Sequence, residues 1–256
     1  MLTVQQIVDF INERAPFDTQ LGFDNSGLLV GHPDQAVTGI HFALDVTNAV
    51  IDEAIANGAN LIVTHHPMMF SPIKRLVETN YEAKLLCRLI RANISLIAAH
   101  TNLDQASGGC NDALAQAIGL TDIQGEGFVR VGSLPAPMKT VDLAAHISAA
   151  LGDTVRVMGS AAAMVEKVGM CSGSGAEEWP EAAAMGAQAF LTGEVKHHIA
   201  LEAADSGMVM LEAGHHATEV PGIFALANAL QNSEVVVQYK IRVSKSEAIA
   251  YQSSMR

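Results

Sequence analysis

The chain has 256 residues, 49% of them hydrophobic and 16% charged, which is the balance of a globular protein. Its formal net charge of −12, with no basic stripe interleaved with aromatic residues, argues against a nucleic-acid partner. No apolar run approaches the roughly 20 residues of a membrane span, and the opening residues lack the basic flank of a signal peptide. The three cysteines form no Cys-x-x-Cys pair, which argues against disulfides and against a thiolate zinc site. We therefore expect a cytoplasmic protein with no membrane partner.

The first half of the chain alternates between strand and helix patterns. Apolar residues at helical spacing follow Thr3, which can cap the helix that they predict. The turn-forming segment Asp24-Asn25-Ser26-Gly27 separates this helix from the alternating region. Helices are predicted at 3–14, 49–57, 81–92 and 111–118, and strands at 37–44, 60–64 and 94–99. This βαβ order predicts a parallel sheet.

The pattern restarts after Gly119. A strand at 127–134 precedes Pro135-Ala136-Pro137, which is typical of a linker or a sharp turn. Beyond it, helices are predicted at 140–151, 176–185, 196–204 and 218–230, and strands at 154–158, 167–171, 187–191, 208–211 and 234–239. We predict an α/β protein of two linked units, residues 1–125 and 126–256, with mainly parallel or mixed sheets. Packing of the C-terminal segment back on the first unit is an additional prediction.

Two adjacent histidines, His65 and His66, end the predicted strand 60–64. Ligands of open α/β sheets gather beyond the carboxyl ends of the strands. Because adjacent side chains point to different sides, this pair suits two metal ions about 3.5–4 Å apart better than one ion. A pair of solvated loop histidines is the alternative, and Pro67 stops the strand in either case.

The next predicted strand, 94–99, runs into His100 and then Asp104. If the two strands are neighbours, these side chains lie beside His65 and His66. Asp104 is the better ligand candidate, although an Asp before a helix is often only a cap. Three roles stay open for His100, which can be a ligand, a hydrogen-bond donor behind the ligands, or a general base.

A third strand end, after 208–211, is followed by His215 and Glu219. Because they are four residues apart, they share one face of a helix and can act as a ligand pair. Glu219 can bridge two metal ions through its two oxygens, whereas His216 points elsewhere. An ordinary ion pair at the start of a helix is the alternative.

Two further segments follow strand ends. Glu194 and His198 lie at helical spacing and can supply acid and base groups near the metals, or can simply face solvent. The Gly-rich turn 171–175 leads into a helix whose N–H groups could hold an anion such as a substrate phosphate. It lacks the Gly-Lys-Ser/Thr ending of a P-loop.

Three separate strand ends that all deliver His or carboxylate residues favour a metal site. A donor set of histidines and carboxylates without cysteine suits zinc, iron or manganese more than calcium. We expect this site at the carboxyl ends of the strands, between the two α/β units.

Four segments of the chain resemble the family of GTP cyclohydrolase I type 2 homologues, and the resemblance runs nearly end to end. They are Asp24-Asn25-Ser26-Gly27-Leu28, Thr64-His65-His66-Pro67, His100-Thr101-Asn102-Leu103-Asp104 with Gly108-Gly109, and Gly214-His215-His216-Ala217-Thr218-Glu219. The resemblance implies a dinuclear metal centre inside a toroidal homohexamer whose subunits each contain two linked α/β units. By match of position, it implies that the metal ligands are His65, His66, Asp104, His215 and Glu219.

We predict a dinuclear metal-dependent hydrolase in which a metal-activated water attacks GTP or a related nucleotide. The groups predicted to move protons are Glu194, His198 and His100. Two divalent metal ions per subunit, either zinc, iron or manganese, are the expected cofactors, and the expected partners are a small-molecule substrate and further copies of the chain in a homohexamer. The alternative is a non-catalytic metal-binding assembly or regulatory protein. A phosphoesterase, which would share the site, is a third hypothesis.

Overall fold

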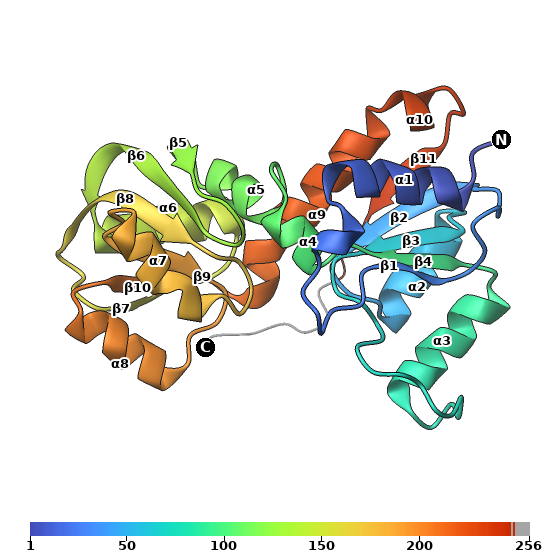
Figure 1. Cartoon of the computed structure of the whole chain (residues 1–256), viewed down its shortest axis with the longest axis horizontal. Coiled ribbons are helices and arrows are strands. Elements are labelled where there is room, and N and C mark those ends of the chain that lie inside the picture. The colour runs from blue at the N-terminus through green and yellow to red at the C-terminus, as the bar shows by residue number, and fades with distance from the viewer. Residues whose placement is uncertain (247, 249–256) are drawn as a thin grey trace. The chain divides into compact units, whose positions relative to one another are not determined.

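The computed structural model describes residues 1–246 and 248 and divides the chain into two compact units (Figure 1). The first unit contains residues 1–103 and the described residues from 223 on, and the second unit contains residues 104–222. The chain passes from one unit to the other inside helix α4 (Thr101–Gln105) and again inside helix α9 (His215–Gln231). The sequence predicts a single crossing after residue 125, whereas the structure has two, and the second comes just after Pro221 inside α9.

The first unit is built on a five-stranded sheet with the strand order β1-β4-β3-β2-β11. Strands β2, β3, β4 and β11 are parallel, and β1 is antiparallel to β4. Its strands are β1 (Gly27–Val30), β2 (Gly39–Ala43), β3 (Leu61–Thr64), β4 (Ser95–Ala98) and β11 (Arg242–Lys245). Its helices are α1 (Val4–Arg14), the 3₁₀ helix η1 (Phe17–Thr19), α2 (Asn48–Ala56), α3 (Tyr81–Arg91) and α10 (Glu234–Val237).

Helices cover both faces of this sheet, which explains the uninterrupted apolar runs in the sequence. Every residue of β2, β3 and β4 is buried, as expected for parallel strands packed on both sides. Figure 1 shows α1 on one side of the sheet and α2 and α3 on the other. The predicted cap of α1 is present as a capping box, in which Thr3 and Gln6 bond each other's backbone N–H groups.

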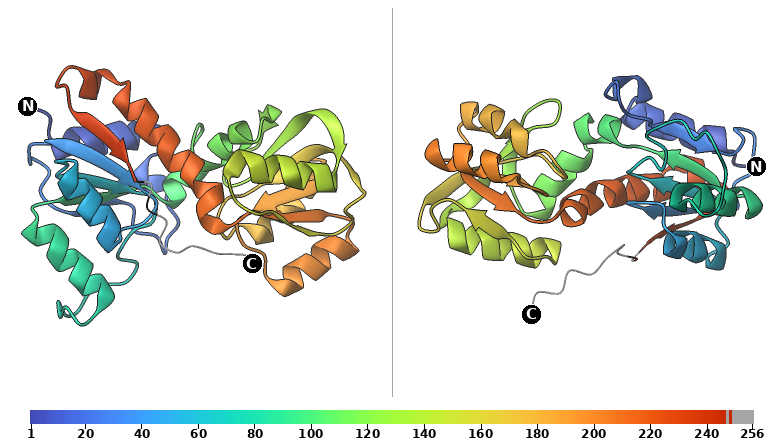
Figure 2. Two further views of the ribbon diagram at one scale, coloured as in Figure 1. Left: turned by 180° about the vertical axis from the view of Figure 1, so that it is seen from behind. Right: turned by 90° about the horizontal axis from the view of Figure 1, so that it is seen from below.

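The last strand of the first unit differs from its prediction. Residues 234–239 were expected to form a strand, but Glu234–Val237 form helix α10, and the strand is β11. The β-branched residues 235–237 favour a strand, but the same residues can also form a helix that starts after Ser233. A short apolar run therefore does not decide between helix and strand. Because β11 is an edge strand with partly exposed residues, it lacks the apolar run that would reveal it. Figure 2 shows β11 beside β2, so the two ends of the sequence meet in one sheet.

The second unit is built on a six-stranded mixed sheet with the order β5-β6-β8-β9-β10-β7. Strands β8, β9 and β10 are parallel, and the remaining pairs are antiparallel. Its strands are β5 (Thr121–Gln124), β6 (Arg130–Lys139), β7 (Arg156–Met158), β8 (Met164–Met170), β9 (Ala189–Thr192) and β10 (Val209–Glu212). Its helices are α5 (Cys110–Ala117), α6 (Thr140–Leu151), the 3₁₀ helix η2 (Ala176–Glu178), α7 (Trp179–Ala184) and α8 (His197–Asp205).

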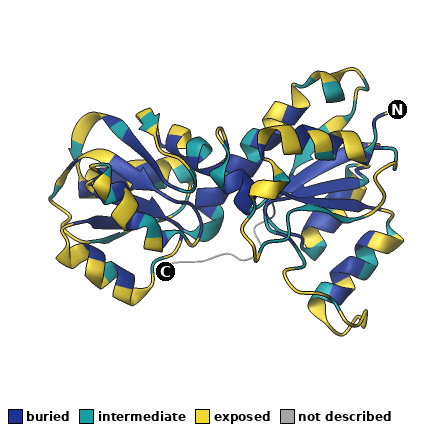
Figure 3. Ribbon diagram, viewed as in Figure 1, coloured by how far each residue is buried: buried dark blue, intermediate teal, exposed yellow. Residues whose placement is uncertain are grey.

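Two apolar cores fill the second unit, one on each face of its sheet. Leu114 of α5 and Ile147 of α6 belong to one core, and Trp179 of α7 and Ile199 of α8 belong to the other. Strands β9 and β10 are buried almost throughout, whereas the outer faces of the helices are exposed (Figure 3). The α/β class with mixed sheets is therefore confirmed, and each unit has the helix-sheet-helix layering of that class.

The segment Pro135-Ala136-Pro137 is not a linker, because it lies inside strand β6. The pairing of β6 with β8 changes register between Ser133 and Met138, so the two prolines fall where the ladder is irregular. Proline is tolerated in a sheet at such a bulge, since it has no N–H to donate there.

Among the described residues, no helix is both long and apolar enough to cross a bilayer.

Candidate metal centre

The first unit brings three histidines together at one edge of its sheet. His65 and His66 follow β3, and His100 follows β4 after one intervening residue. Because Thr64 pairs with Ala98 in parallel register, both strands end at the same edge. The ring centroid of His65 lies 5.1 Å from the ring centroids of His66 and His100, and those two centroids are 5.4 Å apart. One nitrogen from each ring lies within 4.8 Å of the others, which is close enough to hold a metal ion.

A hydrogen bond at Nδ1 fixes the orientation of each of these rings. Nδ1 of His65 lies 2.8 Å from the carbonyl oxygen of Ala99. Nδ1 of His66 lies 2.8 Å from Asp45 Oδ1, and Nδ1 of His100 lies 2.9 Å from Asp24 Oδ1. A carbonyl or an ionised carboxylate only accepts, so each Nδ1 carries the proton and each Nε2 keeps a lone pair. This is the arrangement that metal-binding histidines adopt.

Asp24 ties the segment before β1 to the end of β4. Its side chain is fully buried, and its carboxylate accepts hydrogen bonds from His100 Nδ1, from the backbone N–H of Thr101 and from the hydroxyl of Thr101. Burial by itself would raise the pKa of Asp24, but the hydrogen bonds from His100 and Thr101, together with the positive charge of His100 whenever that ring is protonated, hold it well below its usual range. Asp24 is therefore an ionised carboxylate behind His100.

The second unit places His215 and Glu219 on the first turns of α9. Nε2 of His215 lies 3.1 Å from Glu219 Oε2, as their spacing of one helical turn predicts. Nδ1 of His215 lies 3.1 Å from Glu194 Oε1, so a carboxylate again fixes the ring. Glu219 is 4% exposed, which makes it a buried carboxylate. A buried carboxylate is costly unless a positive group neutralises it, and a protonated His215 or a bound cation would each do so.

Gly173 closes over this pair. Its φ of +60° is in the left-handed region, and a Cβ at this position would overlap Glu219 Oε1 and lie 3.2 Å from His215 Nε2. The backbone at Gly173 therefore leaves no room for a side chain beside Glu219. The N–H groups of Ser172 and Gly173 already bond Asn111 Oδ1 and Thr218 Oγ1, so they do not support the expected phosphate site in this turn.

Asp104 and Cys110 extend the donor set of the second unit. Asp104 is 8% exposed, and its carbonyl accepts a hydrogen bond from Asn111 Nδ2 at 3.1 Å. Burial raises the pKa of the Cys110 thiol well above its usual range, and the charges of Asp104 and Glu219 raise it further. The two predicted carboxylate ligands thus both act on one buried thiol. The sequence indicated no metal role for cysteine, because an isolated Cys has no spacing signal.

The donor chemistry of both units fits a divalent metal. The first unit offers imidazole nitrogens with fixed rings, and the second offers an imidazole and two buried carboxylates. Nitrogen and oxygen donors of this kind suit zinc, iron and manganese.

The family model of Duf34/NIF3 (NGG1p interacting factor 3) matches residues 2–250 of the chain. The chain belongs to this family. It is 33% identical over 222 residues to the GTP cyclohydrolase 1 type 2 homolog of Lactococcus lactis, and the matched region covers 82% of this chain and 86% of that protein. It is 34% identical to the homolog of Streptomyces coelicolor over 86% of this chain and 83% of that protein. The crystal structure of the Staphylococcus aureus protein SA1388 is similar with a TM-score of 0.93 and 27% identity, and the match covers 99% of each chain.

In this member of the Duf34/NIF3 family, the three predicted proton-transfer groups lie in different local surroundings. His100 lies within the histidine cluster, with its side chain 15% exposed. Glu194 contacts His215 and Ser174, with its side chain 58% exposed. His198 is exposed on α8, and its charge lowers the pKa of Glu177, although the hydrogen bond from Lys196 is the main cause of that shift.

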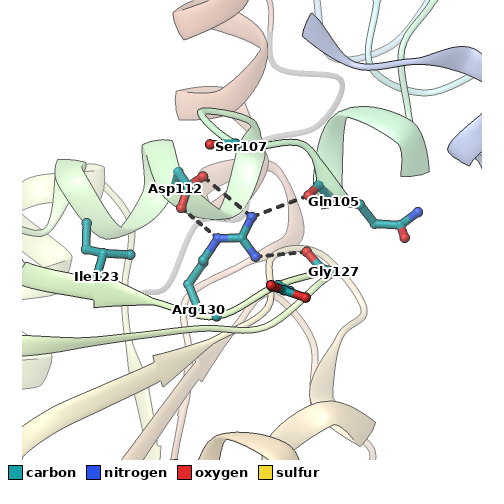
Figure 4. A pocket seen from close by; sticks show the side chains of 8 residues that line it. Gln105, Ser107, Asp112, Ile123, Gly127 and Arg130 are labelled. Atoms are coloured by element: carbon teal, nitrogen blue, oxygen red, sulfur yellow. Dashed lines mark hydrogen bonds and ion pairs between the residues drawn. The ribbon is translucent and has the colours of Figure 1, made fainter.

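A cavity of about 280 Å³ in the second unit lies beside Arg130 (Figure 4). Nε of Arg130 donates to Asp112 Oδ1 at 2.6 Å, and Nη1 donates to the carbonyl oxygens of Gly127 and Val129. Nη2 donates at 3.4 Å to the carbonyl oxygens of the two residues that follow Asp104. The guanidinium is thus committed to the protein, and it fixes the loop behind Asp104 rather than a bound anion.

Two residues that position the histidines were not predicted from the sequence. Asp45 holds His66 and Asp24 holds His100. A signal for Asp45 was available, because it lies just beyond the end of β2 at the same sheet edge. Asp24 was assigned only to a turn, and its contact with a residue 76 positions away has no local signature.

Proposed function

We propose that the chain is a metal-dependent hydrolase with a dinuclear centre held by His65, His66, Asp104, His215 and Glu219. The observation that carries this proposal is the fixed Nδ1 of each site histidine, which leaves Nε2 as the ligand atom. The overlap that a Cβ at Gly173 would create with Glu219 supports a built ligand in the second unit. When bound, two divalent ions supply a Lewis acid and a water whose pKa is lowered toward about 7.

The residues of the chain then have separate tasks. Asp45 and Glu194 hold the rings of His66 and His215. Glu194 is also the group we assign to proton transfer, because its exposed carboxylate can exchange protons with solvent while it contacts Ser174. His198 stays a prediction as a second proton-transfer group on the exposed face of α8.

The substrate we propose is GTP or a related nucleotide. Support comes from relatives that carry the name GTP cyclohydrolase 1 type 2 homolog. Hydrolysis would open the imidazole ring at the carbon between its two nitrogens. The test begins with elemental analysis of the purified protein, followed by assays of formate release from GTP with each metal restored. Turnover that requires metal and disappears in His65→Ala is expected, and no turnover with zinc, iron or manganese would overturn the cyclohydrolase assignment.

One observation favours a second candidate, a non-catalytic metal-binding assembly or regulatory protein. Both oxygens of Glu194 are engaged, with His215 and with Ser174, so a role in holding the ring competes with proton transfer. In this candidate the metal centre stabilises a homohexamer. Sedimentation of the metal-loaded and chelated protein separates the two functions, because loss of hexamers on chelation together with no turnover supports the assembly. A cytoplasmic location stays a prediction in both.

A further inference from the structure

We infer that Phe70 is the residue on which the base of the substrate stacks, so that the site selects a planar heteroaromatic ring. This inference rests on the proposed function, in which the substrate is a nucleotide, and it adds a specificity-determining residue to that site. It concerns residues of the first unit alone. The observation that carries it is a half-exposed aromatic ring in contact with His100.

The chain fixes the position of Phe70 from the same short segment that holds His100. Phe70 lies in the loop between β3 and α3, which begins at the sheet edge that carries the histidines (Figure 1). Nδ2 of Asn25 donates to the carbonyl oxygen of Met69 at 2.6 Å, immediately before Phe70. The preceding residue, Asp24, accepts the hydrogen bond from His100 Nδ1. The backbone at Phe70 and the imidazole of His100 are therefore held next to each other.

The contact with His100 leaves about half of Phe70 exposed to solvent. The two ring centroids lie 5.6 Å apart with an angle of 77° between the ring planes, which is edge-to-face packing. Such a contact covers at most one face of the phenyl ring. Phe70 is 51% exposed, although burial of an aromatic side chain is strongly favourable. A ring that its neighbour holds in place and that still faces solvent is a preformed surface for another flat group.

The surroundings of Phe70 favour a nucleobase over a bare anion or an aliphatic chain. A phenyl ring carries no charge and no hydrogen-bonding group, so it has nothing to offer a free phosphate. An aliphatic chain would cover the polar groups of His100 and Asp24 without bonding them. A base combines a π face with polar edges, and all bases stack on aromatic side chains. Stacked rings have centroids about 4.5–7 Å apart, so a base on Phe70 stays beside the histidines.

The test measures equilibrium binding of guanosine, which carries the base without phosphates, and of inorganic triphosphate, which carries no base. Isothermal titration calorimetry is performed on the full chain. We expect Phe70→Ala to weaken guanosine binding by about 5–150-fold, the loss of one stacked base, and to leave triphosphate binding unchanged. Phe70→Leu keeps an apolar side chain without a π face and should lose guanosine in the same way. Tyr81→Ala is the matched control, because Tyr81 is an aromatic residue with 60% exposure at the start of α3.

The fluorescence of Phe70→Trp reports stacking directly. The chain has a single tryptophan, Trp179, which is buried in the second unit and contributes a constant background. We expect guanosine to quench the indole that Phe70→Trp introduces and not the indole that Tyr81→Trp introduces. A purely structural role of Phe70 would produce no such quenching. Circular dichroism and elemental analysis check that each variant keeps the fold and the metal content of the wild type.

Three results would overturn the inference. They are no guanosine binding by the wild type, guanosine binding by Phe70→Ala and Phe70→Leu that matches the Tyr81→Ala control, and no response of the Phe70→Trp fluorescence. A changed sedimentation coefficient of Phe70→Ala with unchanged guanosine affinity would also overturn it and would assign Phe70 to a contact between copies of the chain.

Failure of the proposed function is a separate result. If no metal supports turnover, the hydrolase assignment fails, whereas the binding of guanosine at Phe70 is measured without turnover and stands. If turnover is found, Phe70→Ala should raise the KM for GTP and leave kcat nearly unchanged, because stacking holds the substrate and the transition state equally. An unchanged KM together with unchanged guanosine affinity would overturn the role of Phe70 and leave the hydrolase in place.

Discussion

The first unit presents candidate metal-binding groups at the ends of two neighbouring parallel strands, whereas the second presents them on a helix and beneath a glycine turn. In the first unit, partners distant in sequence fix the rings, as Asp24 does for His100. In the second, His215 and Glu219 are one turn apart, and Gly173 packs against them. Strand pairing therefore positions the donors in one unit, and local helix geometry with close backbone packing does so in the other.

We expect the largest loss of metal affinity when a predicted ligand at a strand end of the first unit is removed. His65→Ala removes a fully buried imidazole, and we expect the affinity for at least one ion to fall by about 100-fold or more. Metal content after dialysis, measured by elemental analysis, checks this. His32→Ala is the matched control, since that histidine is exposed. Equal metal content in the two variants would contradict a ligand role for His65.

The second unit should depend on the buried ion pair that fixes the loop after Asp104. The side chains of Arg130 and Asp112 are 5% and 16% exposed, so Arg130→Met leaves the largely buried Asp112 carboxylate without its counter-ion, with the N–H of Gly108 still donating to it. We expect a loss of about 3–5 kcal/mol in unfolding free energy, measured by urea denaturation. Arg91→Met, which breaks the exposed pair with Glu78, should leave the urea midpoint nearly unchanged. Similar midpoints for both variants would show that Arg130 is not needed.

Comparing Gly173→Ala with Gly207→Ala separates the cost of backbone strain from the cost of contact with Glu219 and His215. Placing alanine at positive φ costs about 1–2 kcal/mol, and Gly207→Ala, with φ of +83° and open space around it, carries that cost alone. We expect Gly173→Ala to be less stable than Gly207→Ala and, unlike it, to bind metal more weakly. Thermal denaturation and metal titration of the pair measure the difference. If both variants bind metal equally, the close packing on Glu219 does not matter for binding.

The smallest expected effect concerns the strand pair that closes the first unit. His41 of β2 contacts Ser244 of β11 and Glu53, and burial lowers the pKa of His41 below 6.5 despite Glu53. The unfolded chain therefore takes up this proton at a higher pH than the folded chain does. As pH falls below 6.5, the unfolding free energy should decrease by at most about 1.4 kcal/mol per pH unit. Urea denaturation between pH 8 and 5 measures the slope, and an unchanged slope in His41→Gln would assign it to other groups.

Strong periodic patterns made most elements predictable from the sequence. The capped helix at the start of the chain and the buried strands β3 and β4 were confirmed, because an apolar run bounded by turn residues has few other stable solutions. The edge strand β11 and the prolines inside β6 were not predicted, because their stability comes from partners rather than from their own residues.

The sequence by itself determined the α/β class, the positions of the strand ends and the residue types that follow them, because periodicity and turn chemistry are local properties. The tertiary structure alone decided which groups stand behind the histidines. Asp24 reaches His100 across 76 positions, and Asp45 reaches His66 from just beyond the end of the neighbouring strand β2. Such contacts depend on strand order and register, which are set by burial of the whole sheet and are not encoded in any short segment.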